Sequence, residues 1–279
     1  NIYYFLKKPK LNKIFKAIQM EDFFKSKNRS YQKSTTHEYY FEFFFFKNIL
    51  KKFIMYRNYK KEQNSFLSGD KYIYFPLHYQ PEATTYPYGD VFIDQILAIK
   101  LLSVSLPGNI KIIIKEHPDT FNISRIAYIK GSFSRSFDYY EQISKLKNTQ
   151  IVPMNTDTFN LIDNSIAVAT LTGGTGMEAI LRDKPTMIFG NAWYRDCHGV
   201  FNCMSKKSCA DSVKEILNNF SIDRKKVEFF FSEIEKVVFP SSRTGAEPHL
   251  KFTTSKTHLT QDRYRNREDE FRLVAKFFM

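Results

Sequence analysis

The sequence predicts an α/β protein in which helices flank a Rossmann-like parallel sheet, preceded by a helical N-terminal segment. From Lys71 onward, short apolar runs rich in β-branched residues alternate with helical patterns, which is typical of βαβ units. Residues 1–65 differ, because they contain no Gly and one Pro, and their apolar side chains are interleaved with Lys. We therefore expect two or three helices there, before the sheet begins.

Five short apolar runs are predicted as strands. His117-Pro118 stops the second run, and the glycines at 173 and 174 follow the fourth, because Pro and Gly interrupt regular structure. In chain order, the predicted strands are Tyr72–Leu77, Ile110–Lys115, Gln150–Val152, Ile166–Leu171 and Thr186–Phe189.

Amphipathic patterns between and after these runs predict helices. The first covers Gly89–Ser105 and ends at Leu106-Pro107-Gly108. After Gly190 the chain reads as helical again, and Pro240–His258 is polar and predicted as a loop. The other predicted helices are Ser136–Leu146, Thr156–Asn164, Gly176–Arg182, Cys209–Phe220, Ile222–Val238 and Arg263–Phe278.

The domain organisation follows from composition and charge. A turn at Ser65–Asp70 separates a basic, aromatic-rich segment (1–68) from the α/β domain (69–240), which a polar loop and C-terminal helix (241–279) follow. Residues 1–65 carry 15 Lys and Arg against 5 Asp and Glu, a net charge of +10, which leaves +3 for the rest. This segment could contact anionic lipid or form the solvated face of a helical subdomain. No nucleic-acid motif accompanies the charge, so no nucleic-acid partner is expected.

Cysteine usage and hydropathy restrict the class of protein further. Cys197, Cys203 and Cys209 are odd in number and lack a Cys-x-x-Cys spacing, so we expect reduced thiols in a cytoplasmic protein and no metal site. The sequence has no run of 18 apolar residues and no signal-peptide pattern, so neither a transmembrane helix nor a signal peptide is expected.

The most informative motif is Leu171-Thr172-Gly173-Gly174-Thr175-Gly176-Met177-Glu178. A strand that breaks into glycines and hydroxyls and then becomes a helix can bind phosphate, since glycines allow close approach and the helix N-terminus attracts anions. The motif has neither the Walker spacing nor the G-x-G-x-x-G spacing. A second interpretation stays open, because Thr175 and Glu178 have the spacing of a capping box.

Four loops follow the carboxyl ends of predicted strands, and in a parallel sheet they would converge at one edge. His117 could donate to a phosphate oxygen or simply bond to backbone. His78 and Glu82 flank Pro81 and could supply acid/base chemistry or bind a substrate hydroxyl, although Glu82 could equally be a solvated charge. The roles of four other loop residues also stay open. Lys115 and Glu116 could form an exposed pair at a strand end, and Trp193 and Tyr194 could stack on a ligand or simply pack.

Four stretches of these loops carry a family resemblance. In order, the sequence reads Tyr-Phe-Pro-Leu-His-Tyr-Gln-Pro-Glu-Ala-Thr-Thr (74–85), Lys-Glu-His-Pro (115–118), Thr-Gly-Gly-Thr-Gly-Met-Glu-Ala (172–179) and Lys-Pro-Thr-Met-Ile-Phe-Gly (184–190). Over about residues 70–205 this resembles the capsule polysaccharide biosynthesis family, which includes the β-Kdo transferases of bacterial capsule assembly.

The resemblance implies a metal-independent glycosyltransferase of the GT-B type, with this match in its donor-binding half and residues 1–68 as a remnant or linker of the acceptor half. It implies a nucleotide-sugar donor, with CMP-linked sugars as candidates, and no other cofactor. The acceptor would be a glycolipid or polysaccharide at the inner face of the cytoplasmic membrane. The Kdo-transferring members usually show Gln…Asp in the first loop, whereas this chain reads Gln80-Pro81-Glu82, so the donated sugar stays open.

The resemblance also implies roles for individual residues. Glu82 lies in the loop where such enzymes often present a carboxylate towards the reacting sugar, and with His78 beside it we expect these two residues to be catalytic. The residues that would bind the donor phosphate and nucleotide are Lys115, His117, Pro118, Thr172, Gly173, Gly174, Thr175 and Glu178. Two other functions stay open: a nucleotide-sugar epimerase or hydrolase on the same fold, and a non-catalytic scaffold at a membrane surface.

Overall fold

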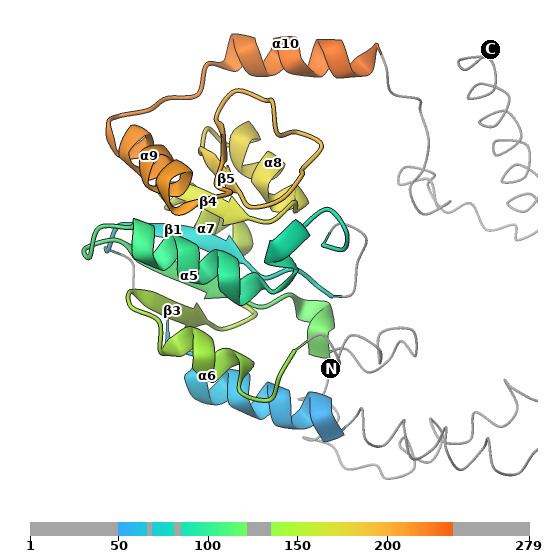
Figure 1. Cartoon of the computed structure of the whole chain (residues 1–279), viewed down its shortest axis with the longest axis vertical. Coiled ribbons are helices and arrows are strands. Elements are labelled where there is room, and N and C mark those ends of the chain that lie inside the picture. The colour runs from blue at the N-terminus through green and yellow to red at the C-terminus, as the bar shows by residue number, and fades with distance from the viewer. Residues whose placement is uncertain (1–49, 66–68, 81–84, 122–134, 237–279) are drawn as a thin grey trace, which may run out of the picture. The chain divides into compact units, whose positions relative to one another are not determined.

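The computed structural model describes residues 50–65, 69–80, 85–121 and 135–236 (Figure 1). The chain divides into two compact units, Asn1–Ile222 and Asp223–Met279. In the second unit the described element is helix α10 (Arg224–Glu235), which Asp223 caps by accepting from the Lys225 N–H at 3.0 Å. The predicted segments 1–68, 69–240 and 241–279 stay predictions. The loop Pro240–His258 and the helix Arg263–Phe278 lie outside the described residues, as do parts of the leader and of the turn at 65–70.

The first unit contains a six-stranded sheet in which every pairing is parallel, as the sequence predicted. The strand order is β3-β2-β1-β4-β5-β6, that of the Rossmann fold. The strands are β1 (Tyr72–Pro76), β2 (Lys111–Lys115), β3 (Thr149–Val152), β4 (Ala167–Thr170), β5 (Thr186–Ile188) and β6 (Val200–Asn202). The direction of winding reverses between β1 and β4, which creates a crevice at their carboxyl ends.

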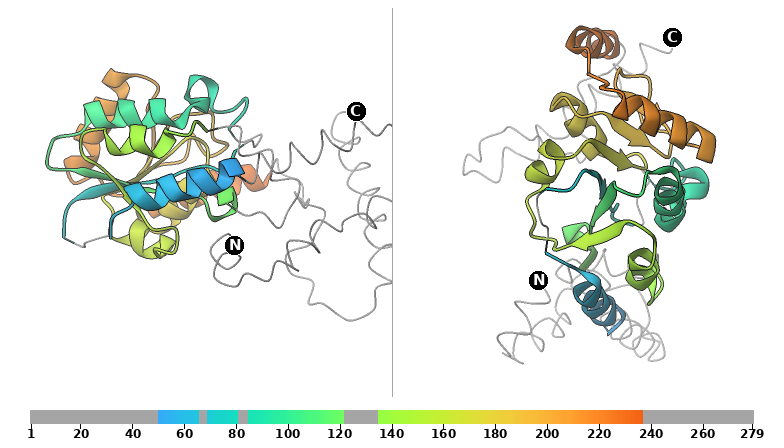
Figure 2. Two further views of the ribbon diagram at one scale, coloured as in Figure 1. Left: turned by 90° about the horizontal axis from the view of Figure 1, so that it is seen from below. Right: turned by 90° about the vertical axis from the view of Figure 1, so that its left-hand side faces the viewer.

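Helices cover both faces of this sheet (Figure 2). Ile73 and Phe75 on β1 pack in one apolar cluster with residues of α5, α6, α9 and the helix over 50–62. Tyr72 and Tyr74, which alternate with them, pack with α7 and α8 on the other face. The helices are α5 (Gln95–Ser105), α6 (Tyr139–Ser144), α7 (Thr158–Asp163), α8 (Gly174–Leu181) and α9 (Lys206–Leu217), with 3₁₀ turns η1 (Asp90–Ile93) and η2 (Pro118–Phe121).

Local capping explains where the structure departs from the predicted helix bounds. The helix predicted over Gly89–Ser105 is interrupted, because Asp94 is extended and its carboxylate accepts from the Ile96 N–H at 3.1 Å to begin α5. Helix α9 begins three residues earlier than predicted, because Ser205 and Ser208 form a reciprocal capping box.

The strands and helices between 69 and 189 are otherwise confirmed, with ends shifted by a few residues. The prediction that the chain is only helical after Gly190 is wrong, because β6 extends the sheet beside β5. Within the described residues, no helix is both long and apolar enough to cross a membrane.

Candidate functional site

The candidate site lies where β1 and β4 end side by side in the sheet. Loop 77–80 follows β1, and the glycine-containing loop 171–173 follows β4 and leads into α8. Ligands of doubly wound sheets bind at this reversal of strand order. The predicted convergence of the two loops is confirmed by direct contacts between His78, Thr170 and Leu171.

The first turn of α8 has no side-chain cap. Its N-cap is Gly173, and α8 starts at Gly174, so the predicted capping box of Thr175 and Glu178 is wrong. The N–H groups of Gly174 and Thr175 donate to no acceptor among the described residues, and Gly174 is exposed. An uncapped helix N-terminus presents free N–H donors and a positive dipole end to an anion.

A buried tyrosine, Tyr194, holds the backbone of the loop at Gly173. Its ring is fully buried, and its hydroxyl donates to the Gly173 carbonyl at 2.5 Å. Gly176 faces the same hydroxyl, and a Cβ there would lie 2.3 Å from it. Of the two open interpretations, Tyr194 is therefore a packing group. Trp193 is 59% exposed, and its ring centroid lies 5.4 Å from that of Tyr194.

His78 is buried between the two loops with its tautomer fixed. The Leu171 N–H donates to His78 Nε2 at 3.2 Å, so this nitrogen must be an acceptor. The Thr170 hydroxyl lies 2.8 Å from the same nitrogen and accepts from the Gly173 N–H at 3.3 Å. The ring therefore carries its hydrogen on Nδ1, which is the group that His78 can offer to a ligand.

The environment of His78 predicts a pH dependence of stability. Burial lowers the pKa of His78 from 6.5 to about 4, with smaller contributions from Arg135 and His117. As the pH falls below 6.5, His78 is protonated in the unfolded chain but stays neutral in the folded protein. The free energy of unfolding therefore decreases between pH 6.5 and 4. We expect a loss of up to about 3 kcal/mol from this group. Urea unfolding from pH 4 to 7 measures it, and His78→Gln should flatten the curve; an unchanged slope would contradict the assignment.

His117 is half-buried in the loop after β2. Its Nδ1 accepts from the Asp119 N–H at 3.2 Å, which leaves Nε2 to carry the hydrogen of the neutral ring. Its ring centroid lies 5.8 Å from that of Tyr79, in the loop after β1. One histidine nitrogen is thus bonded to backbone, as the plainer interpretation expected, while the other is left to act as a donor.

A buried ion pair that the sequence did not indicate joins these loops. Glu116 is fully buried, so its interpretation as an exposed charge is wrong, and its carboxylate pairs with the buried Arg135. Tyr140 and Thr120 donate hydroxyl hydrogens to the same carboxylate, as does the His117 N–H at 2.6 Å. No motif surrounds Arg135. Apart from Tyr139 and Tyr140, its partners lie 19 residues or more away along the chain, so no local pattern could have identified it.

The remaining predicted residues are placed as follows. Lys115 is also buried, and its ammonium donates to the Thr156 carbonyl at 2.7 Å and to the Thr158 hydroxyl, at the start of α7. Burial lowers the pKa of Lys115. Thr172 is buried, whereas Pro118 and Glu178 are exposed. Glu82 lies outside the described residues.

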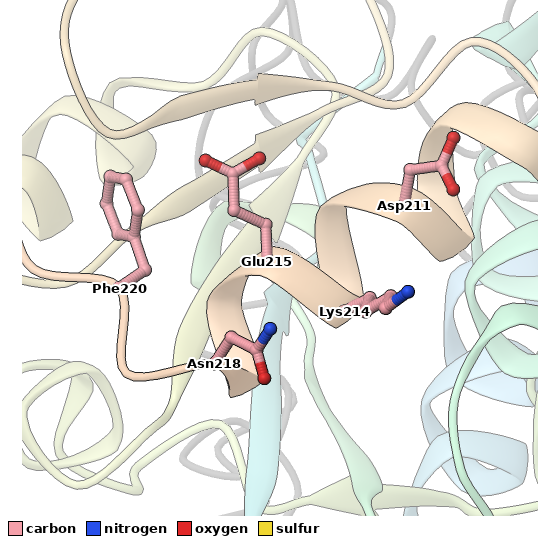
Figure 3. A pocket seen from close by; sticks show the side chains of 5 residues that line it. All are labelled: Asp211, Lys214, Glu215, Asn218 and Phe220. Atoms are coloured by element: carbon pink, nitrogen blue, oxygen red, sulfur yellow. The ribbon is translucent and has the colours of Figure 1, made fainter.

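A pocket of about 360 Å³ lies away from this edge (Figure 3). It is lined by Asp211, Lys214, Glu215, Asn218 and Phe220. The Phe220 ring packs on Phe201 of β6 and on His198, just before that strand begins. The pocket therefore belongs to the amino-terminal edge of the sheet, whereas ligands of such sheets bind at the carboxyl edge.

Comparison with protein families connects the chain to capsule synthesis. A family model described as "Capsule polysaccharide biosynthesis protein" matches residues 14–207, well over half of the chain. A search of curated proteins gives no match. Among the residues that the structure describes, no group of three or more His, Cys, Asp or Glu could hold a metal ion.

Solved structures give distant similarities. Staphylococcus aureus MnaA with UDP is 12% identical, with a TM-score of 0.34 over 63% of this chain and 42% of that one. KpsC of Thermosulfurimonas dismutans, a β-Kdo 2,7 transferase, is 15% identical, with a TM-score of 0.36 over 67% and 64%. A Listeria monocytogenes protein described as a UDP-N-acetylglucosamine 2-epimerase is 12% identical, with a TM-score of 0.32 over 63% and 40%. The chain covers less than two thirds of each of these structures.

Proposed function

The chain belongs to the capsule polysaccharide biosynthesis family, and from this premise we propose that it is a glycosyltransferase that takes a sugar from a nucleotide-sugar donor. The observation that carries the proposal is the uncapped start of α8, which follows β4 at the reversal of strand order and whose first two N–H groups have no acceptor among the described residues. The acceptor is a glycolipid or polysaccharide of capsule assembly, reached at the inner face of the cytoplasmic membrane. CMP-linked sugars are the first donors to test.

The proposed mechanism is electrostatic. When the bond between the sugar and the phosphate breaks, negative charge develops on the departing phosphate, and donors already aimed at it lower the barrier. The N–H groups of Gly174 and Thr175 supply such donors, together with the positive end of α8. His117 adds its Nε2 hydrogen, since Nδ1 is held by Asp119. These groups need no metal ion to act.

His78 and Glu82 differ in the chemistry they can supply. A ring with a pKa of about 4 is a weak base at neutral pH, so we assign His78 to hydrogen bonding through Nδ1. Glu82 follows in the same loop and remains the proposed carboxylate for the reacting sugar.

Substitution of His117 tests its assigned role. We expect His117→Ala to lower both nucleotide affinity and sugar transfer at least about tenfold, or about 1.4 kcal/mol, with the fold intact. Isothermal titration measures the affinity, a transfer assay measures the activity, and circular dichroism checks that the fold is intact. His198→Ala is the matched control, because His198 stacks on Phe220 at the opposite edge of the sheet. Unchanged affinity and activity in His117→Ala would remove this residue from the site.

Product analysis separates transfer from the alternative chemistries. A glycosyltransferase releases the nucleotide from its donor mainly when an acceptor is present, whereas an epimerase or hydrolase consumes the donor alone. Rapid turnover of a nucleotide sugar without acceptor would therefore contradict the proposed transfer reaction.

A further inference from the structure

The buried Arg135 connects the two loops that carry the histidines of the site. Its guanidinium pairs with Glu116 in the loop after β2 and donates to the His78 carbonyl, in the loop after β1, at 2.7 Å. Glu116 in turn accepts from the His117 N–H at 2.6 Å. One ion pair therefore bonds to the backbone of both histidines, from a segment that belongs to neither loop.

Two tyrosines of α6 complete this network. The Arg135 guanidinium also donates to the Tyr140 hydroxyl at 3.2 Å and lies over the Tyr139 ring, with Cζ 4.9 Å from the ring centroid. The Tyr140 hydroxyl in turn donates a hydrogen bond to the Glu116 carboxylate. A planar guanidinium with several fixed donors defines an orientation that a single point charge does not.

We infer that Arg135 is a positioning residue of the site, which holds the His78 loop and the His117 loop in the arrangement that binds the donor phosphate. The inference rests on the proposed function only for what the histidines bind. Burying such a pair gives little net stability compared with apolar packing, so its value lies in the arrangement that it imposes.

The charges near His78 predict the direction in which its pKa should change when Arg135 is substituted. Arg135 and His117 are the charged or titratable groups that lower the pKa of His78, after burial. Among the described residues, the side chains that bond to His78 besides Arg135 are neutral: Gln95 of α5, which bonds to the His78 backbone, and Thr170 at the end of β4, which bonds to the ring. Removal of the Arg135 charge should therefore raise the pKa of His78, whereas removal of the Glu116 charge should not, because Arg135 keeps its charge there.

The decisive comparison is between Arg135→Gln and Glu116→Gln, which break the same ion pair from opposite sides. In the full chain without ligand, we expect NMR titration of the His78 ring to move upward by at least about half a pH unit in Arg135→Gln and not upward in Glu116→Gln. A purely structural role would move both in the same direction. If Arg135→Gln does not fold, the double variant that combines Glu116→Gln with Arg135→Met removes both charges. The same upward shift of the His78 pKa is expected in that variant.

Nucleotide binding provides the second measurement. Titration with CMP, UDP and GDP should show at least about tenfold weaker binding in Arg135→Gln than in the wild type. Arg182→Gln is the control, because it breaks an exposed pair with Asp163 at the far end of α8. A His78 titration and an affinity that are both unchanged in Arg135→Gln would overturn the inference. Failure of the wild type to bind any of the three would instead overturn the proposed function, and the His78 titration would still decide the role of Arg135.

Discussion

Gly173→Ala is expected to weaken nucleotide binding strongly. The backbone at Gly173 has φ −72° and ψ 151°, which any residue can adopt, so the cost is steric. A Cβ would stand 2.9 Å from both His78 Cε1 and the Thr170 hydroxyl oxygen. Because hydrogen bonds fix both groups, the methyl must separate the two loops. We expect at least about a hundredfold loss of affinity by isothermal titration, or about 2.7 kcal/mol.

Gly174→Ala is the matched control for the fold. A Cβ at Gly174 meets no atom within 4 Å, and Ala is favoured over Gly in a helix. Its thermal unfolding should therefore equal or exceed that of the wild type, whereas Gly173→Ala should unfold at a lower temperature. Equal unfolding temperatures and equal affinities in the wild type and Gly173→Ala would show that the loop tolerates the methyl, and would contradict this packing.

Glu116→Ala is expected to cost the most stability of any substitution near the site. It leaves the Arg135 charge buried without its carboxylate and removes the acceptor of Tyr140, Thr120 and the His117 N–H. Breaking a buried pair from one side typically costs about 3–5 kcal/mol. Because many domains have only about 5–15 kcal/mol of stability, urea unfolding should show a large fall in midpoint.

Asp163→Ala provides the comparison at the surface. Asp163 also pairs with an arginine, Arg182, but both side chains are more than a third exposed to solvent. Exposed pairs contribute little, so its midpoint should stay close to that of the wild type. If Glu116→Ala and Asp163→Ala lose similar stability, the buried pair does not have the structural importance given to it here.

The sheet could be predicted from the sequence because its central strands are buried on both faces. Tyr72–Pro76 and Lys111–Lys115 are short apolar runs bounded by clear interruptions. Strand β6 could not be predicted in the same way, since Val200–Asn202 is three residues long, lies at the sheet edge and is only partly buried. The break at Asp94 depends on a cap, and the apolar periodicity continued across it.

The arrangement of the loops at the candidate site could be predicted in part, for a physical reason. Parallel topology brings strand ends together, so the meeting of the His78 loop with the loop at Gly173 followed from the fold. The start of α8 was misplaced by two residues, because Gly173 rather than Thr175 is the N-cap. Arg135 was missed because its importance lies in contacts with residues distant in sequence, which no local pattern encodes.

The most direct test of the central claim is isothermal titration of the full chain with CMP, UDP and GDP, without added metal. The proposed site predicts that one nucleotide binds, and that His117→Ala and Gly173→Ala each weaken the binding at least about tenfold while His198→Ala does not. Absence of binding to all three nucleotides, or binding that both substitutions leave unchanged, would contradict a nucleotide site at the carboxyl ends of β1 and β4.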